Sequence, residues 1–167
     1  LIDALENNPE ISDQIYTYLS SIPLDLEEKK RVEDYLLEDS KAIYGWQNYL
    51  LWKICVLKEI DSINLLNFSK EIIESSENYT SKCGALLYIG RFGTDAEKIE
   101  ISHKFNEFDD FMIQRHGIIA LQKLDFKHIN HISKYVIPEV HGMLRKINSK
   151  KLPKYIEPPA KLDYKDI

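Results

Sequence analysis

The sequence predicts an all-α fold in which antiparallel helix pairs stack into an α-α superhelix. The first observation is an eight-residue pattern that occurs three times, in 54–61, 86–93 and 118–125. Its first four positions and its seventh are apolar or aromatic in every copy, and its eighth is Asp or Gly. The second observation is that apolar residues recur at helical rather than alternating spacing. The copies follow one another with a constant period of about 32 residues, and a period in the thirties built from helix pairs is typical of an α-solenoid.

Residues 1–40 are expected to form two helices that cap one end of the stack. Asn8 is a plausible N-cap with Pro9 at the first helical position, which opens a helix to about Ser20. Its apolar stripe consists of Ile11, Ile15, Tyr18 and Leu19.

Pro23 ends this first helix, and Asp25 can cap a second one that runs through Leu37. The apolar residues of the second helix are Leu26, Val32, Tyr35 and Leu36. Its acidic residues, Glu33 among them, are interpreted as a solvated outer face.

Residues 41–147 are expected to hold three repeats and a terminal helix. The first repeat predicts helices over about 42–60 and 63–75. In the second repeat, Asn78 or Thr80 caps a helix to Phe92, and a Thr94–Glu97 capping box opens the next helix, which ends at 105 or 108.

The third repeat is predicted to begin with a helix from the Asp109 cap to Leu124, followed by one over about 127–136. Pro138 then restarts the chain as a short helix to about Ile147. Residues 148–167 lose the periodicity and are rich in Lys and Pro, which predicts an extended basic tail.

Composition fits one domain of ordinary globular character. The 167 residues are 44% hydrophobic and 29% charged. No apolar run approaches the roughly 18 residues of a membrane span, and no signal peptide is apparent, so a cytoplasmic location without membrane contact is expected. Because the chain starts at Leu1 rather than Met, it is expected to be a fragment of a longer protein. Cys55 and Cys83 are interpreted as buried free thiols.

The net charge of −5 conceals a gradient along the chain. Residues 1–40 carry −8, residues 41–122 carry −2, and residues 123–167 carry +5. One end of the stack is therefore expected to be acidic and the other basic, which bears on partners rather than on the fold.

One basic cluster is the main candidate for nucleic-acid binding. It consists of Arg145, Lys146, Lys150, Lys151, Lys154 and the neighbouring Tyr155. Such a run can neutralise several phosphates, and the tyrosine can stack on a base. The alternative is a cationic helix end that continues into a solvated linker.

An aromatic stripe in the first repeat, Trp46, Tyr49 and Trp52, is the candidate partner surface. Its spacing predicts a seam against the two acidic N-terminal helices. If part of the stripe is exposed, it marks a surface for a protein partner, since aromatic residues anchor interfaces.

No catalytic residue, cofactor or metal site is predicted. Nucleophile and phosphate-loop motifs are absent, and His128 and His131 share a helix face without the further ligands that zinc needs. Arg91 and Arg115 are expected to pair with Glu59, Asp95 or Asp109 across neighbouring repeats. Gly84, Gly90 and Gly117 are interpreted as points of close helix approach.

The phrases 83–93 (CGALLYIGRFG) and 115–121 (RHGIIAL) resemble HEAT-type repeats, with a likeness that covers about 42–137. The same phrase pattern is similar to the helical region after the polymerase in some bacterial reverse transcriptases, including those of phage defence. This resemblance implies a non-catalytic C-terminal domain that contacts nucleic acid or an upstream domain, with the polymerase site outside these residues. The rival hypotheses are a protein-interaction scaffold unrelated to a polymerase and a small metal-dependent or RNase enzyme.

Overall fold

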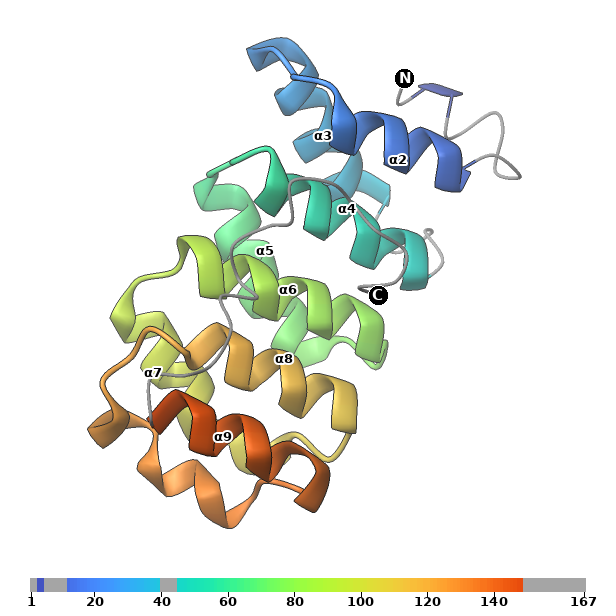
Figure 1. Cartoon of the computed structure of the whole chain (residues 1–167). Coiled ribbons are helices and arrows are strands. Elements are labelled where there is room, and N and C mark those ends of the chain that lie inside the picture. The colour runs from blue at the N-terminus through green and yellow to red at the C-terminus, as the bar shows by residue number, and fades with distance from the viewer. Residues whose placement is uncertain (1–2, 5–11, 40–44, 149–167) are drawn as a thin grey trace.

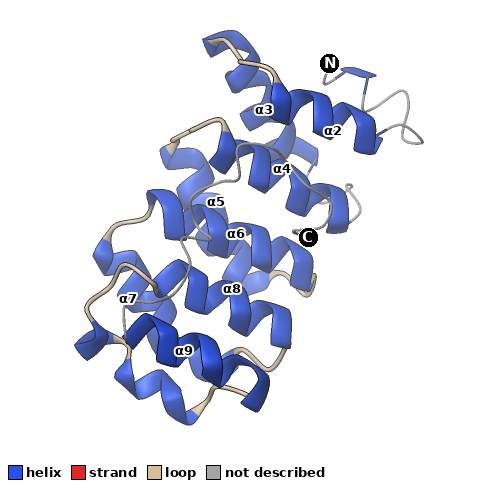
Figure 2. Ribbon diagram, in the orientation of Figure 1, coloured by secondary structure: helices blue, strands red, loops and turns tan. Residues whose placement is uncertain are grey.

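The computed structural model describes residues 3–4, 12–39 and 45–148, and these ranges contain helices and loops but no strand (Figure 2). The α-helices are α2 (Ser12–Ser21), α3 (Leu26–Asp39), α4 (Gly45–Leu57), α5 (Ile63–Ser75), α6 (Tyr79–Phe92), α7 (Asp95–His103), α8 (Phe111–Leu121) and α9 (His141–Asn148). Four 3-10 helices accompany them, η2 (Phe105–Glu107), η3 (Phe126–His128), η4 (Asn130–Lys134) and η5 (Pro138–Val140). The all-α prediction is confirmed.

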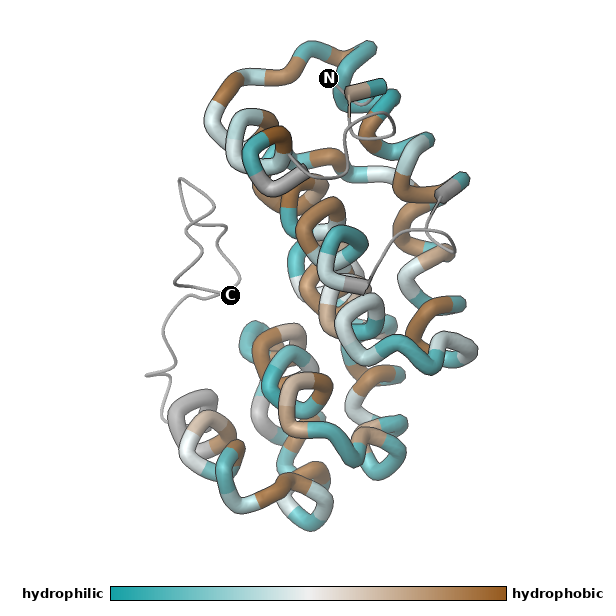
Figure 3. Tube along the Cα trace, turned by 90° about the vertical axis from the view of Figure 1, so that its right-hand side faces the viewer, coloured by the Kyte–Doolittle hydropathy of each residue, from teal (hydrophilic) through white to brown (hydrophobic). Residues whose placement is uncertain are grey.

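The helices form two layers (Figure 1). Helices α2, α4, α6, α8 and α9 follow one another side by side and run in the same direction, while α3, α5 and α7 return behind them. Helix α6 packs against α4, α5 and α8, which places it at the centre of the stack. We call the five side-by-side helices the front layer. Figure 3 shows their apolar segments distributed along the whole length of the stack rather than gathered at one end.

The repeated sequence pattern corresponds to the core. The residues at its first position, Ile54, Leu86 and Ile118, are fully buried in all three copies. The residues at the second and third positions are buried in every copy too, and Leu57 and Phe92 are partly buried. The constant period of the pattern therefore describes equivalent buried positions on α4, α6 and α8.

The turn between α4 and α5 is held by α6. Glu59 adopts a positive φ of 53° in this turn, and its carboxylate pairs with Arg91 at 2.7 Å. The Tyr88 hydroxyl donates to the Ile60 carbonyl at 2.8 Å and accepts from the Ser62 amide at 2.9 Å. Glu59 and Arg91 occupy the same position in successive copies of the pattern, so the predicted pairing between neighbouring repeats is confirmed for Arg91.

Polar contacts of Lys58 and Glu33 help to hold the N-terminal pair α2–α3 on the rest of the stack. The Lys58 ammonium donates to the carbonyls of Ser20 and Ile22 and so supplies hydrogen-bond donors at the C-terminal end of α2. Glu33 is buried and accepts from the hydroxyl of Ser62, the N-cap of α5. The prediction of a solvated Glu33 was wrong, because its carboxylate finds polar partners in the Ser62 hydroxyl and in Lys30, 3.3 Å away, which offset the cost of its burial.

Two residues of the predicted N-terminal stripes face solvent instead of the core. Leu26 is 86% exposed, and Tyr18 is exposed while its neighbour Tyr16 is buried. Asp25 and Glu28 form a reciprocal capping pair at the start of α3, as each backbone amide donates to the other side chain. This pair fixes the start of α3 without requiring Leu26 to be buried.

The cap of α8 is Asp110 rather than Asp109. The Asp110 carboxylate accepts from the amides of Met112 and Ile113, and the helix ends at Leu121, before the expected Leu124. Asp109 is exposed and lies just outside the cap. Both carboxylates suit a helix N-terminus, so the sequence alone could not separate them.

The predicted α-helix over 127–136 is instead a pair of short 3-10 helices. Three of its residues still face the core, at Ile129, Ile132 and Val136. The side chain of Gln114 takes the place of α-helical hydrogen-bond partners for the backbone around Tyr135. Its amide nitrogen donates to the Tyr135 carbonyl at 2.9 Å, and its amide oxygen accepts from the Ile137 amide at 2.8 Å.

We expect Gln114→Leu to lower the free energy of unfolding by about 2–4 kcal/mol. The substitution leaves the carbonyls of Phe108 and Tyr135 and the amide of Ile137 without the partner they have now. Urea denaturation followed by circular dichroism measures the loss. The matched control is Gln122→Leu, a half-buried glutamine at the end of the same helix. An equal loss in both variants would contradict a stabilising role for the hydrogen bonds of Gln114.

Cys55 and Cys83 are buried and unpaired with each other, as predicted. Burial raises the pKa of the Cys83 thiol to about 12. Among the helices described, none combines the length and the apolar character that crossing a membrane requires.

Candidate functional site

The predicted basic cluster falls largely beyond what the structure describes. Arg145 and Lys146 belong to α9, but their side chains are not among the described parts. Lys150, Lys151, Lys154 and Tyr155 lie outside the described residues. Nucleic-acid binding by this cluster therefore stays a prediction.

The aromatic stripe of α4 does not form the predicted seam against α2 and α3. Trp52 is fully buried, packs on Tyr88 with ring centroids 5.3 Å apart, and approaches Gly84. Tyr49 is buried and points towards α8. Trp46 alone of the three is exposed, so a partner can reach only this member of the stripe.

Tyr49 and His116 join α4 to α8 across α6. The Tyr49 hydroxyl lies 3.1 Å from His116 Nε2, and His116 Nδ1 lies 2.7 Å from the Met112 carbonyl. A carbonyl can only accept, so Nδ1 carries the proton and Nε2 accepts the hydrogen bond of the tyrosine. Burial lowers the pKa of His116 to about 4, which keeps the imidazole neutral.

Charged groups from the front layer surround this bridge. The cations of Arg115 and Lys53 lower the pKa of His116 further, while Asp110 acts in the opposite direction. Burial raises the pKa of the Tyr49 hydroxyl well above its usual value, and the nearby Cys83 of α6 raises it further. The contacts of Tyr49 therefore bring residues of α4, α6 and α8 into one neighbourhood.

Exposed aromatic residues begin three consecutive front-layer helices. Trp46 is 39% exposed, Tyr79 is 51% exposed and Phe111 is 40% exposed. They occupy the first turns of α4, α6 and α8, whose N-terminal ends lie along one edge of the structure (Figure 1). We call these three residues the aromatic row. Sequence reasoning missed it, although Tyr79 and Phe111 are one repeat period apart and stand directly after capping residues.

Two cations accompany the aromatic row. Lys82 follows Tyr79 by three residues and Arg115 follows Phe111 by four, so each lies on the same side of its helix as the aromatic residue. Both are half-buried, and within the described residues neither charged group has a hydrogen bond or an ion pair. The predicted pairing of Arg115 with an acidic residue is therefore not found there.

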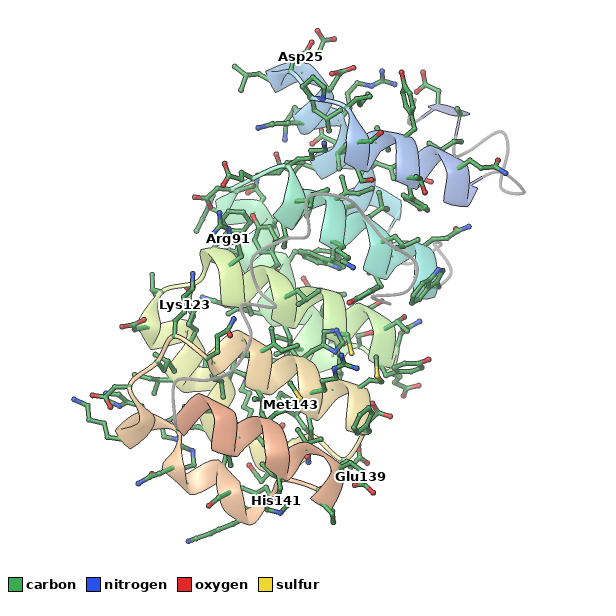
Figure 4. The ribbon with its side chains drawn as sticks, in the orientation of Figure 1. Asp25, Arg91, Lys123, Glu139, His141 and Met143 are labelled. Carbon is green, nitrogen blue, oxygen red and sulfur yellow. The ribbon has the colours of Figure 1, made fainter. Side chains whose placement is uncertain are left out.

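The opposite edge of the front layer also carries cations. Arg91 and Lys123 lie on the side where α6 and α8 end (Figure 4). Arg91 is paired with Glu59, and Lys123 occupies the equivalent position in the third copy. The N-terminal edge thus combines an exposed aromatic row with two cations that have no ion pair within the described residues, so planar and anionic groups can be bound together there.

The histidines do not gather into a metal site within the described ranges. His103 and His131 stack with ring centroids 5.3 Å apart, and His131 Nε2 lies 3.0 Å from the Ser102 carbonyl. In that part of the chain no three metal-ligating side chains converge. Comparison with protein families, with curated proteins and with solved structures finds no match for this chain.

Proposed function

We propose that this chain is a non-catalytic helical-repeat domain of the HEAT-like superhelix type, which binds nucleic acid. The observation that carries the proposal is that a regular stack of helices is combined with a net charge that rises along the chain. The chain passes from −8 in residues 1–40 to +5 in residues 123–167. A repeat stack offers a long surface, and a segment of the chain with a positive net charge attracts phosphates.

The repeat character is supported by contacts between equivalent positions. Glu59 and Arg91 pair between successive copies of the pattern, and the first pattern position is fully buried on α4, α6 and α8. Each helix pair contributes apolar surface that its neighbour covers, as expected when stacking rather than a separate core stabilises the unit.

Binding at the basic end is supported by groups that follow α8. Lys134 and Tyr135 are adjacent and exposed, and Lys123 is exposed at the end of the front-layer surface. A lysine beside an exposed tyrosine provides the charge and the stacking plane that a nucleotide uses. Arg145, Lys146, Lys150, Lys151, Lys154 and Tyr155 extend the same basic segment in sequence.

The experiment is binding of labelled single-stranded and duplex RNA and DNA at two salt concentrations. Binding is expected to weaken steeply with salt, because phosphate contacts release counterions. Changing Lys150, Lys151 and Lys154 to Glu is expected to weaken it further. Absence of binding at low salt would overturn the proposal.

We further propose that the domain follows the polymerase of a bacterial reverse transcriptase. The support is the resemblance of the phrases 83–93 and 115–121 to that helical region. The reading frame before Leu1 is then expected to encode a Tyr-x-Asp-Asp motif. Sequencing that frame tests this parentage separately, and a frame without the motif would remove it.

A protein-interaction scaffold is the second candidate, and the exposed apolar residues of the N-terminal pair favour it. Leu26 and Tyr18 project from the acidic helices α3 and α2. A contact through such residues is expected to be far less sensitive to salt than phosphate binding. Association that survives high salt and is lost in Leu26→Ser would favour the scaffold.

A further inference from the structure

We infer that the N-terminal edge of α4, α6 and α8 binds single-stranded nucleic acid, with bases stacked on Trp46, Tyr79 and Phe111. Lys82 and Arg115 would contact the phosphates. The inference rests on the proposed function, but it names a second site, separate from the basic C-terminal end.

The aromatic row presents rings at regular steps. Tyr79 and Phe111 each occupy the first position of a helix, one repeat period apart, and Trp46 occupies the second position of α4. Since α4 packs against α6 and α6 against α8, and the three helices run in the same direction, their first turns follow one another along one edge (Figure 1). One ring is therefore offered for each helix along the edge.

The ring of Trp46 is partly buried, which restricts its orientation. Trp46 stacks on Tyr49 with centroids 5.6 Å apart and an interplanar angle of 26°. Tyr49 is in turn fixed by its hydrogen bond to His116. The indole thus rests on a rigid support and leaves part of its surface to solvent, so a base can stack there with little loss of side-chain entropy.

The spacing favours a single strand over a duplex. Neighbouring packed helices lie about 8–10 Å apart, whereas stacked bases in a duplex follow one another at about 3.4 Å per strand. Successive rings can therefore receive bases only from a strand whose own stacking is broken. Bases of a duplex are paired and stacked, and they do not offer a free face to a protein ring.

Cations and carboxylates fix the orientation of the strand. Lys82 and Arg115 lie one turn into their helices and have no ion pair within the described residues. Glu77 and Asp109 lie exposed just outside the first turns of α6 and α8, and they are also one repeat period apart. Lys82 and Arg115 attract phosphates, whereas Glu77 and Asp109 repel them. The sugar-phosphate backbone therefore lies on the Lys82 and Arg115 side of the aromatic row.

Binding is tested with labelled single-stranded RNA and DNA of about 15 nucleotides, in the length range of single-strand binding sites. The double variant Tyr79→Leu/Phe111→Leu keeps two apolar side chains and removes two stacking planes. We expect its affinity to fall about 100-fold, roughly tenfold for each ring. The matched control is Tyr18→Leu, an exposed tyrosine on α2, which is expected to bind as wild type.

The charge arm compares Lys82→Gln/Arg115→Gln with Glu77→Gln/Asp109→Asn. The first pair is expected to lower affinity and to reduce the salt slope by about 1.4, because two phosphate contacts with a single strand are lost. The second pair is expected to raise affinity, because two repulsive charges are removed. Lys29→Gln, on α3, is the control for loss of a surface lysine. Urea denaturation confirms that each variant remains folded.

The outcomes separate this site from the proposed function. If wild type binds and the Lys150, Lys151 and Lys154 changes abolish binding while the aromatic-row variants bind normally, the inference fails and the proposed function stands. If wild type binds no oligonucleotide at low salt, the proposed function fails and the inference with it. If the aromatic-row variants bind oligonucleotides as wild type does and instead lose a salt-resistant association with a protein, the surface is a protein interface and the inference is overturned.

Discussion

Gly84→Ala is expected to lower the free energy of unfolding by about 1–3 kcal/mol, the usual range for overpacking a core. A Cβ atom at this position would lie 2.5 Å from Trp52 Cδ1 and 2.7 Å from Trp52 Cγ. Contacts this short are sterically forbidden, so either the indole must shift or α4 and α6 must move apart. Alanine is favoured over glycine in a helix by up to ~1 kcal/mol, so the steric effect must exceed an opposing gain.

A double-mutant cycle with Trp52 tests the cause of this loss. Trp52→Ala alone is expected to cost about 3–5 kcal/mol, because it removes a fully buried indole. In that background Gly84→Ala is expected to become neutral or stabilising, since the clashing ring is gone and the helical preference of alanine remains. Urea midpoints of the four proteins give the coupling energy.

Gly142→Ala is the control for the glycine exchange. This residue lies in α9, and a Cβ atom there would meet nothing within 4 Å. The variant is expected to gain stability through helical preference alone. Strictly additive effects of Gly84→Ala and Trp52→Ala would contradict the close approach of α4 and α6 at this point.

The sequence predicts close helix approach at Gly84, but it does not identify the partner. Residues 48–56 of α4 are all buried, because α4 packs against α2 and α3 on one side and against α6 on the other. A helix that is buried on all sides gives no single hydrophobic stripe from which its orientation can be inferred. The prediction that the aromatic stripe faces the N-terminal pair failed for this reason.

Local signals predict the helix ends better than they predict tertiary contacts. The N-cap Asn78, the Thr94–Glu97 capping box and the helix over 63–75 are confirmed, since these depend on neighbours in sequence. The burial of Glu33 and the 3-10 geometry near Tyr135 depend on Ser62 and Gln114, which are far away in sequence. No local pattern carries that information.

The aromatic row illustrates the same limit at the candidate site. Tyr79 and Phe111 repeat at the period of the chain, so their equivalence is visible in the sequence. Their exposure is not, because an aromatic residue at the start of a helix can turn either towards the core or towards solvent. The stacking of the helices decides between these directions.

His116 is expected to make the stability of the fold dependent on pH. Its pKa is lowered from 6.5 to about 4 by burial, with further lowering by the cations of Arg115 and Lys53. The unfolded chain therefore takes up a proton as the pH falls below 6.5, while the folded chain does so only near 4. The contribution of the neutral imidazole is complete above the unfolded pKa and is lost as the pH falls towards the folded one.

Between about pH 7.5 and pH 5 this difference is worth about 2 kcal/mol of unfolding free energy. Urea denaturation at both values measures the fall in wild type and in His116→Phe, which cannot titrate. The other four histidines remain in both proteins, so the difference between the two falls isolates His116. Because its Nδ1 already donates to Met112 and its Nε2 accepts from Tyr49, protonation would add a donor where the bridge requires an acceptor. An identical fall in both proteins would mean that His116 accommodates its charge in the folded state, and the neutral bridge between α4 and α8 would have to be abandoned.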